Sequence, residues 1–195
     1  MKIINNKIYI KILFFGTALA GKTTSLKWIF ENIIPEKMKI NKNIKSIKTS
    51  FGQTLLLDFV QVQLNENILI RFFTSTGQNY YAATRKILME GVDGIFFVID
   101  SQKKELDNNK EFVKEFKNYL ENIKELEDTE VIVLYNKQDL NDVYPLNFLM
   151  QELGLSDYPS YPISALNGKN LKIAFIDMIS RLLKKIKLIK EHSLV

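Results

Sequence analysis

The sequence of 195 residues contains no cysteine. Disulfides, thiolate metal sites, cysteine nucleophiles and cysteine-linked lipids are therefore excluded. The single histidine, His192, leaves no histidine cluster for a metal ion and argues against a histidine-based catalytic triad. No apolar run approaches the ~18 residues that a membrane-spanning helix requires. What remains are folds and activities that need none of these groups.

Length and composition indicate one globular domain over residues 1–195. Hydrophobic residues make up 46% and charged residues 25% of the chain, which is ordinary globular usage. The net charge of +5 accompanies a general excess of lysine, so we expect no nucleic-acid partner. The apolar stretch before 18–20 resembles a secretory signal, but Lys11 interrupts it and cleavage would cut the motif described next. We therefore expect a cytoplasmic protein.

The clearest motif is 16–23, Gly-Thr-Ala-Leu-Ala-Gly-Lys-Thr, which fits the phosphate-loop pattern G-x-x-x-x-G-K-[ST]. It follows a stretch typical of a buried strand, 7–15, and precedes apolar residues at helical spacing. In that context, backbone N–H groups and the helix N-terminus surround a pyrophosphate. We expect Lys22 to reach the β- and γ-phosphates and Thr23 to ligate Mg²⁺. The predicted phosphate contacts are Gly16, Thr17, Ala18, Leu19, Ala20, Gly21, Lys22, Thr23 and Thr24.

A second motif indicates the base. The apolar strand 130–135 runs into Asn136-Lys137-Gln138-Asp139. The Asp139 carboxylate can accept from guanine N1–H and from the exocyclic amine, a donor pair that adenine lacks. We expect Asn136 to bond the guanine N7 edge and tie loops together, while the stem of Lys137 covers the base. A short strand over 160–163 leads to three residues whose N–H groups could meet guanine O6, Ser164, Ala165 and Leu166.

Each base motif alone would be read as a polar turn, but downstream of a phosphate loop they predict a guanine nucleotide. A P-loop ATPase or kinase is the rival interpretation, and Asn136 and Asp139 disfavour it.

With these motifs the chain resembles Ras-superfamily small GTPases over essentially its whole length, most closely the MglA-type branch of prokaryotic polarity and gliding-motility GTPases. The segments that carry the resemblance are 21–24, 54–59, 74–78, 91–94, 100–102 and 136–139. It implies an α/β P-loop NTPase fold with a six-stranded, mostly parallel sheet, an antiparallel second strand at its edge and about five flanking helices. It also implies a switch that binds GTP or GDP with Mg²⁺ and hydrolyses GTP.

The resemblance also assigns residues to hydrolysis. Thr54 is our choice for the threonine that completes the Mg²⁺ shell in the GTP state, with Thr49 and Ser50 as alternatives. The N–H of Gly77 is expected to meet the γ-phosphate. Gln78 is expected to orient the attacking water, because phosphoryl transfer depends on positioning and charge stabilisation more than on a strong base.

Three departures from the family pattern bear on the rate. Thr74 stands where most small GTPases carry an aspartate that holds a Mg²⁺-bound water, and Asp58 is the candidate to replace it. Ala18 and Leu19 stand where Ras-like proteins carry glycines. The MglA-type branch resembles enzymes that carry a built-in arginine just before the switch threonine, and here Gln53 occupies that position. Such an arginine raises the rate by a factor of about 10³–10⁵. We therefore expect slow intrinsic hydrolysis, with a GTP-binding scaffold of negligible hydrolysis as the alternative.

Partners are expected on the switch surface, 51–62 and 74–85. The apolar strand 51–62 could accept a partner strand or shift register, unless the segment 36–48 covers it. The resemblance points to a GTPase-activating protein, a roadblock-type dimer, and to a downstream effector. The basic stretch 181–190 could touch anionic lipid transiently, but no signal for a stable lipid anchor is present.

Overall fold

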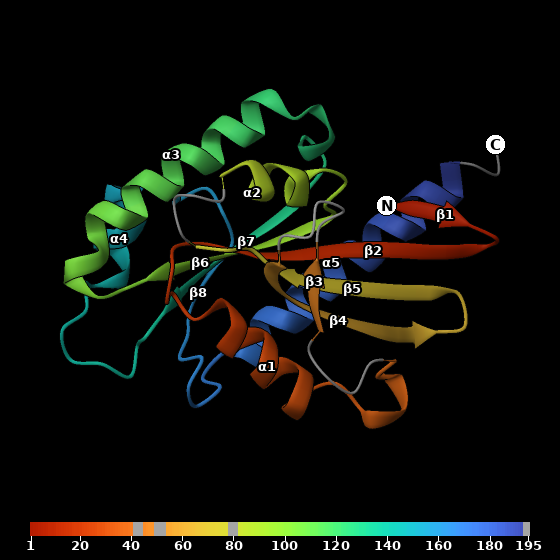
Figure 1. Ribbon diagram of the computed structural model, residues 1–195, viewed down its shortest axis with the longest axis horizontal. Coiled ribbons are helices and arrows are strands. Elements are labelled where there is room, and N and C mark those ends of the chain that lie inside the picture. The colour runs from red at the N-terminus through yellow and green to blue at the C-terminus, as the bar shows by residue number, and fades with distance from the viewer. Residues whose placement is uncertain (41–44, 49–53, 78–81, 193–195) are drawn as a thin grey trace.

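A mixed β-sheet with helices on both faces organises the computed structural model (Figure 1). The structure describes residues 1–40, 45–48, 54–77 and 82–192. Strand β1 (Lys2–Ile4) pairs with β2 outside the main path of the sheet. The main path runs through β3 (Lys45–Lys48), β4 (Thr54–Asn65), β5 (Ile68–Thr74), β2 (Lys7–Phe15), β6 (Gly94–Asp100), β7 (Glu130–Asn136) and β8 (Ser160–Pro162).

Parallel pairing brings the functional loops to one edge of the sheet. Strands β5, β2, β6, β7 and β8 are parallel, so their carboxyl ends meet at the same edge. The phosphate loop follows β2, residues 75–77 follow β5, and the motif 136–139 follows β7. Ligands of open α/β sheets bind in this position. The predicted fold class is confirmed, and β4 is its antiparallel strand.

The helices form two layers because side chains alternate across each strand. Helices α1 (Lys22–Asn32) and α5 (Leu171–His192) cover one face, where Ile12 and Phe14 of β2 are buried. The other face buries Leu13 and Phe15 under α2 (Ala82–Met89), α3 (Leu106–Asn122) and α4 (Leu146–Glu152). Single 3-10 turns within the described residues are η1 (Glu36–Met38), η3 (Lys103–Glu105) and η4 (Lys124–Leu126). Across the described ranges, no helix combines the length and the apolar character needed to cross a bilayer.

The antiparallel strand β4 is not the outermost strand of the sheet. Strand β3 pairs with it from Lys45↔Phe59 to Lys48↔Thr54, and Lys39 bridges to Val62 further along. This pairing corrects the expectation of an open edge at β4, because Lys39 and residues 45–48, which belong to the segment that we gave as the alternative, cover it. A partner strand would therefore meet β3 first. Strands β1 and β3 also extend the sheet beyond the six strands expected.

Candidate nucleotide-binding site

The phosphate loop approaches its neighbours so closely that two positions require glycine. Gly16 has φ +146°, and a Cβ there would lie 2.2 Å from the Val98 carbonyl oxygen. Gly21 has φ +99°, and a Cβ there would lie 2.1 Å from Nδ2 of Asn136. Without these Cβ atoms, the backbone N–H groups can turn inward as a phosphate cradle requires.

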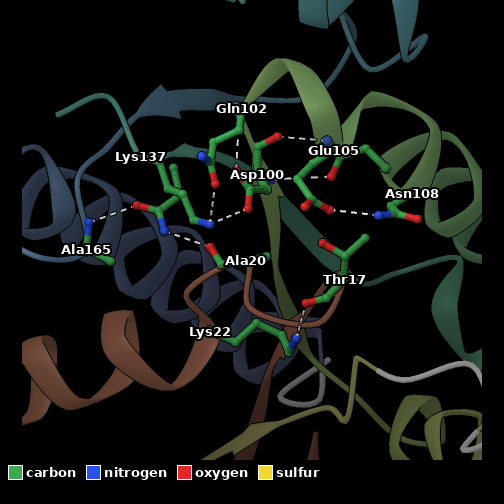
Figure 2. A network of polar contacts seen from close by, with 11 residues as sticks. Thr17, Ala20, Lys22, Asp100, Gln102, Glu105, Asn108, Lys137 and Ala165 are labelled. Atoms are coloured by element: carbon green, nitrogen blue, oxygen red, sulfur yellow. Dashed lines mark hydrogen bonds and ion pairs between the residues drawn. The ribbon is translucent and has the colours of Figure 1, made fainter. Parts of the chain in front are cut away.

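Lys22 lies buried inside this loop. Its Nζ donates hydrogen bonds to the carbonyl oxygens of Gly16 and Thr17, at 2.9 and 2.5 Å. Figure 2 shows the bond to Thr17. Burial and, to a smaller extent, the positive charge of Arg85 together lower the pKa of the Lys22 ammonium to about 8, against the opposing effect of Asp58. A phosphate would compensate both unfavourable effects, since it supplies the negative charge that a buried ammonium lacks.

One carboxylate oxygen joins the start of α1 to the end of β5. Oδ2 of Asp58 accepts a hydrogen bond from the Thr23 hydroxyl and another, at 3.2 Å, from the Thr74 hydroxyl. The Asp58 backbone N–H in turn donates to the Thr74 oxygen at 3.1 Å. A carboxylate from the neighbouring strand therefore lies beside Thr74 and next to the hydroxyl predicted to ligate Mg²⁺.

The residues present fit a magnesium ion only in cooperation with a nucleotide. Within the described ranges, no group of three or more histidine, cysteine, aspartate or glutamate side chains could hold a metal. The oxygen atoms of Thr23 and Asp58 are donors of the kind that Mg²⁺ prefers. Because Mg²⁺ is usually held by one or two protein groups together with substrate phosphates, this small donor set suits a nucleotide-bound ion.

Asn136 connects the phosphate loop with the predicted base loop. Its Nδ2 donates to the Ala20 carbonyl oxygen at 2.7 Å, and its Oδ1 accepts from the Ala165 N–H at 2.8 Å. Dashed lines to Ala20 and Ala165 mark these two bonds in Figure 2. The side chain is buried, so both bonds are shielded from water. Two segments far apart in the sequence are thereby held as one site.

Lys137 has a partner that the sequence did not indicate. Its Nζ forms an ion pair with Asp100, a buried carboxylate at the end of β6, and donates to Oε1 of Gln102 at 2.9 Å (Figure 2). The Gln102 N–H donates to the same Asp100 at 3.1 Å. The amine is thus anchored beside the site, and the predicted cover of the base would come from its aliphatic stem. Asp139, by contrast, is exposed at the carboxyl end of β7.

The loop after β8 is packed against α1. The Gly168 N–H donates to the Ser164 carbonyl oxygen at 2.8 Å and closes a turn around Ala165. Gly168 has φ +80°, and a Cβ there would lie 1.8 Å from the ring of Trp28. Leu166 projects from this turn and is 77% exposed. Trp28 therefore supports the turn that contains the three residues predicted to meet the base.

Several predicted residues are not tested by this geometry. Gln78, Gln53 and the alternatives Thr49 and Ser50 lie outside the described residues. Thr54 begins β4, and the structure describes only its backbone. Their roles stay predictions.

Comparison with known proteins agrees with this geometry. The model of the ADP-ribosylation factor family matches residues 1–183. The mutual gliding-motility protein MglA of Myxococcus xanthus is 32% identical over 169 residues, 84% of this chain and 85% of that protein. The ADP-ribosylation factor-like protein 3 of Saccharomyces cerevisiae is 27% identical over 188 residues, 91% of this chain and 88% of that protein.

Proposed function

Because this chain belongs to the ADP-ribosylation factor family of small GTPases and to their MglA-type branch, we propose that it binds GTP or GDP with Mg²⁺ and hydrolyses GTP slowly. The observation that carries the proposal is the Asn136 side chain, which bonds both the phosphate loop and the base loop. A phosphate cradle and a guanine-specific carboxylate, Asp139, thereby belong to one binding site.

In this proposal, the phosphate loop holds the triphosphate with its backbone N–H groups and with Lys22. The ammonium leaves the carbonyl oxygens of Gly16 and Thr17 for the β- and γ-phosphate oxygens, which are stronger acceptors because they carry charge. Thr24 lies beside the α-phosphate. The turn formed by Ser164, Ala165 and Leu166 would face guanine O6. The Ala165 N–H donates to Asn136 in this structure and the Ser164 N–H donates to the Lys169 carbonyl oxygen, so either group would exchange its partner for O6 on binding.

The Mg²⁺ ion would be held by Thr23 and, in the GTP state, by Thr54, with Asp58 acting through a water molecule. The ion supplies charge that stabilises the phosphate oxygens as the bond to the γ-phosphorus breaks. Support comes from the Thr23 hydroxyl, which the Asp58 carboxylate already orients.

For hydrolysis, Gln78 orients a water molecule whose oxygen attacks the γ-phosphorus. The bond between that phosphorus and the β–γ bridging oxygen breaks, the β-phosphate keeps the electron pair, and the attacking water gives up its proton to the released phosphate. The Gly77 N–H donates to the γ-phosphate. The turnover is slow because Gln53 brings no charge where an arginine would be worth about 10³–10⁵ in rate.

The specificity is tested by binding. Fluorescent GTP, GDP and ATP are titrated against the wild-type protein and against Asp139→Ala, Lys22→Ala and, as a matched control, Asp142→Ala, whose carboxylate is exposed outside the motif. We expect Asp139→Ala to lose the preference for guanine nucleotides and Lys22→Ala to lower the affinity for every nucleotide tested. Equal affinity of the wild-type protein for ATP and GTP would refute the proposal.

The alternative is a GTP-binding scaffold with negligible hydrolysis, and Thr74, Ala18 and Gln53 support it. Single-turnover phosphate release from bound GTP, with and without Gln78→Leu, separates the two. A slow release that Gln78→Leu abolishes supports the switch. A release that Gln78→Leu leaves unchanged supports the scaffold.

The cellular role is proposed from the relative's name. MglA is called a mutual gliding-motility protein, so we propose a role in cell polarity, motility or related regulation in the cytoplasm. A GTPase-activating partner, with a roadblock-type dimer as the candidate, would bind the surface 51–62 and 74–85, and an effector would read the GTP state there. The basic segment 181–190 would touch anionic lipid only transiently.

A further inference from the structure

Arg85 of α2 is the largest side chain that is fully buried in the described part of the chain, with 1% of its surface exposed. Burying a guanidinium is costly unless its donors are paired. Glu115 of α3 pairs with it on two sides, through Nε–Oε1 and Nη2–Oε2 contacts of 2.7 Å each. Such a two-bond arrangement fixes the plane of the guanidinium as well as its position.

The environment of the pair holds it in one arrangement. Tyr119 of α3 donates its hydroxyl to Glu115, and the ring of Phe112 lies 4.9 Å from the guanidinium carbon. Phe112 and Glu115 contact the guanidinium and Tyr119 contacts Glu115, so helix α3 determines where Arg85 can reach.

The remaining arm of Arg85 reaches the switch motif. Its Nη1 donates to the Thr76 carbonyl oxygen at 3.4 Å. This carbonyl and the Gly77 N–H belong to one peptide unit, and in a trans peptide the two groups point in opposite directions. A donor fixed on the carbonyl side therefore turns the N–H to the opposite side.

Gly77 itself lies against the phosphate loop. The Ala18 N–H donates to the Gly77 carbonyl oxygen at 3.1 Å, and a Cβ at Gly77 would lie 2.1 Å from the Ala18 nitrogen. A cation on the carbonyl also polarises the peptide and strengthens its N–H as a donor.

We propose that Arg85 is a positioning residue for recognition of the γ-phosphate: anchored on α3 by Glu115, it holds the Thr76–Gly77 peptide so that the Gly77 N–H faces the terminal phosphate. The inference rests on the proposed function, because Gly77 recognises a γ-phosphate only if this site binds GTP. It predicts a defect that distinguishes GTP from GDP, since GDP has no group at that position.

The test compares Arg85→Gln with the wild-type protein and with Lys86→Ala, a matched control on the same helix whose lysine is exposed. Affinities for GDP and for a non-hydrolysable GTP analogue are measured with saturating Mg²⁺. In Arg85→Gln the affinity for the analogue should fall about tenfold, the effect of losing one charge-assisted hydrogen bond, while the affinity for GDP stays within about twofold. Lys86→Ala should leave both affinities unchanged.

A second variant covers the case in which Arg85→Gln does not fold, which circular dichroism detects. Glu115→Asp keeps both charges and shortens the anchor, so Arg85 is drawn away from Thr76 and the same selective loss of analogue affinity is expected. Equal losses for GDP and the analogue, or an unchanged ratio in the folded variants, would overturn the inference and indicate a merely structural ion pair. A wild-type protein that binds neither nucleotide would refute the proposed function itself.

Discussion

The contact between Gly168 and Trp28 allows a prediction whose size follows from the structure. In Gly168→Ala the new Cβ would have to sit 1.8 Å from one ring carbon of Trp28 and 2.0 Å from the next. Two costs arise. An alanine at φ +80° costs about 1–2 kcal/mol of backbone strain. Displacing the ring from a packed position costs about a further 1–3 kcal/mol.

Gly91 supplies the matched control for the first cost. It also has a positive φ, +64°, but a Cβ there would meet nothing within 4 Å. Gly91→Ala should therefore lower the free energy of unfolding by only about 1–2 kcal/mol, the backbone cost alone. Gly168→Ala should lower it by about 2–5 kcal/mol, and the difference between the two variants measures the packing of Trp28.

The assay is urea unfolding of the wild-type protein, of Gly91→Ala, Gly168→Ala and Trp28→Leu, and of Trp28→Leu combined with Gly168→Ala. The smaller leucine should remove most of the clash with the new Cβ. The double variant should therefore lose less free energy of unfolding than the sum of the losses in its two single variants. Affinity for GDP should fall in Gly168→Ala and not in Gly91→Ala, because only the former distorts the turn around Ala165. Equal destabilisation by the two glycine variants would refute the reasoning.

Two further predictions concern the phosphate half of the site. Asp58→Asn should weaken the Mg²⁺ affinity of the GDP complex by about 10- to 100-fold, the usual effect of losing an outer partner of a metal, and Mg²⁺ titration should show no change in the control Asp128→Asn. Because the Lys22 ammonium must be charged to bind phosphate and its pKa is lowered to about 8, GDP affinity should fall as the pH rises above about 8, approaching tenfold per pH unit. Calorimetry over pH 7–9 (roughly) tests this, with proton uptake on binding expected above about pH 8, and a flat profile would contradict it.

Local sequence patterns predicted the parts of the site that lie along one stretch of chain. The phosphate loop needs glycines at fixed places between a strand and a helix, and the motif 136–139 needs a buried strand before it. Both requirements are visible within about 20 residues of sequence. The double role of Asn136 was also predictable in kind, because a buried amide has donors and an acceptor to satisfy.

The contacts that were missed join residues distant in the sequence. Arg85 and Glu115 are 30 positions apart, and the partner of Lys137 lies on another strand. Nothing in the local composition distinguishes Arg85 and Glu115 from solvated surface charges. The missed strand β1 did have a signal, since Asn5 and Asn6 take φ values of 49° and 59°, and adjacent asparagines favour a two-residue hairpin turn.

The pairing of β4 with β5 explains why the Asp58 carboxylate lies beside the Thr74 hydroxyl. Phe59 lies directly opposite Phe73 in this antiparallel register, so the next pair along is Asp58 and Thr74. Opposite residues of an antiparallel pair present their side chains on the same face, about 5 Å apart. A carboxylate on either strand can therefore orient the same Thr23 hydroxyl. The sequence around Thr74 taken alone indicates a metal site that lacks a carboxylate. When the facing strand is included, Asp58 supplies a carboxylate at the same place.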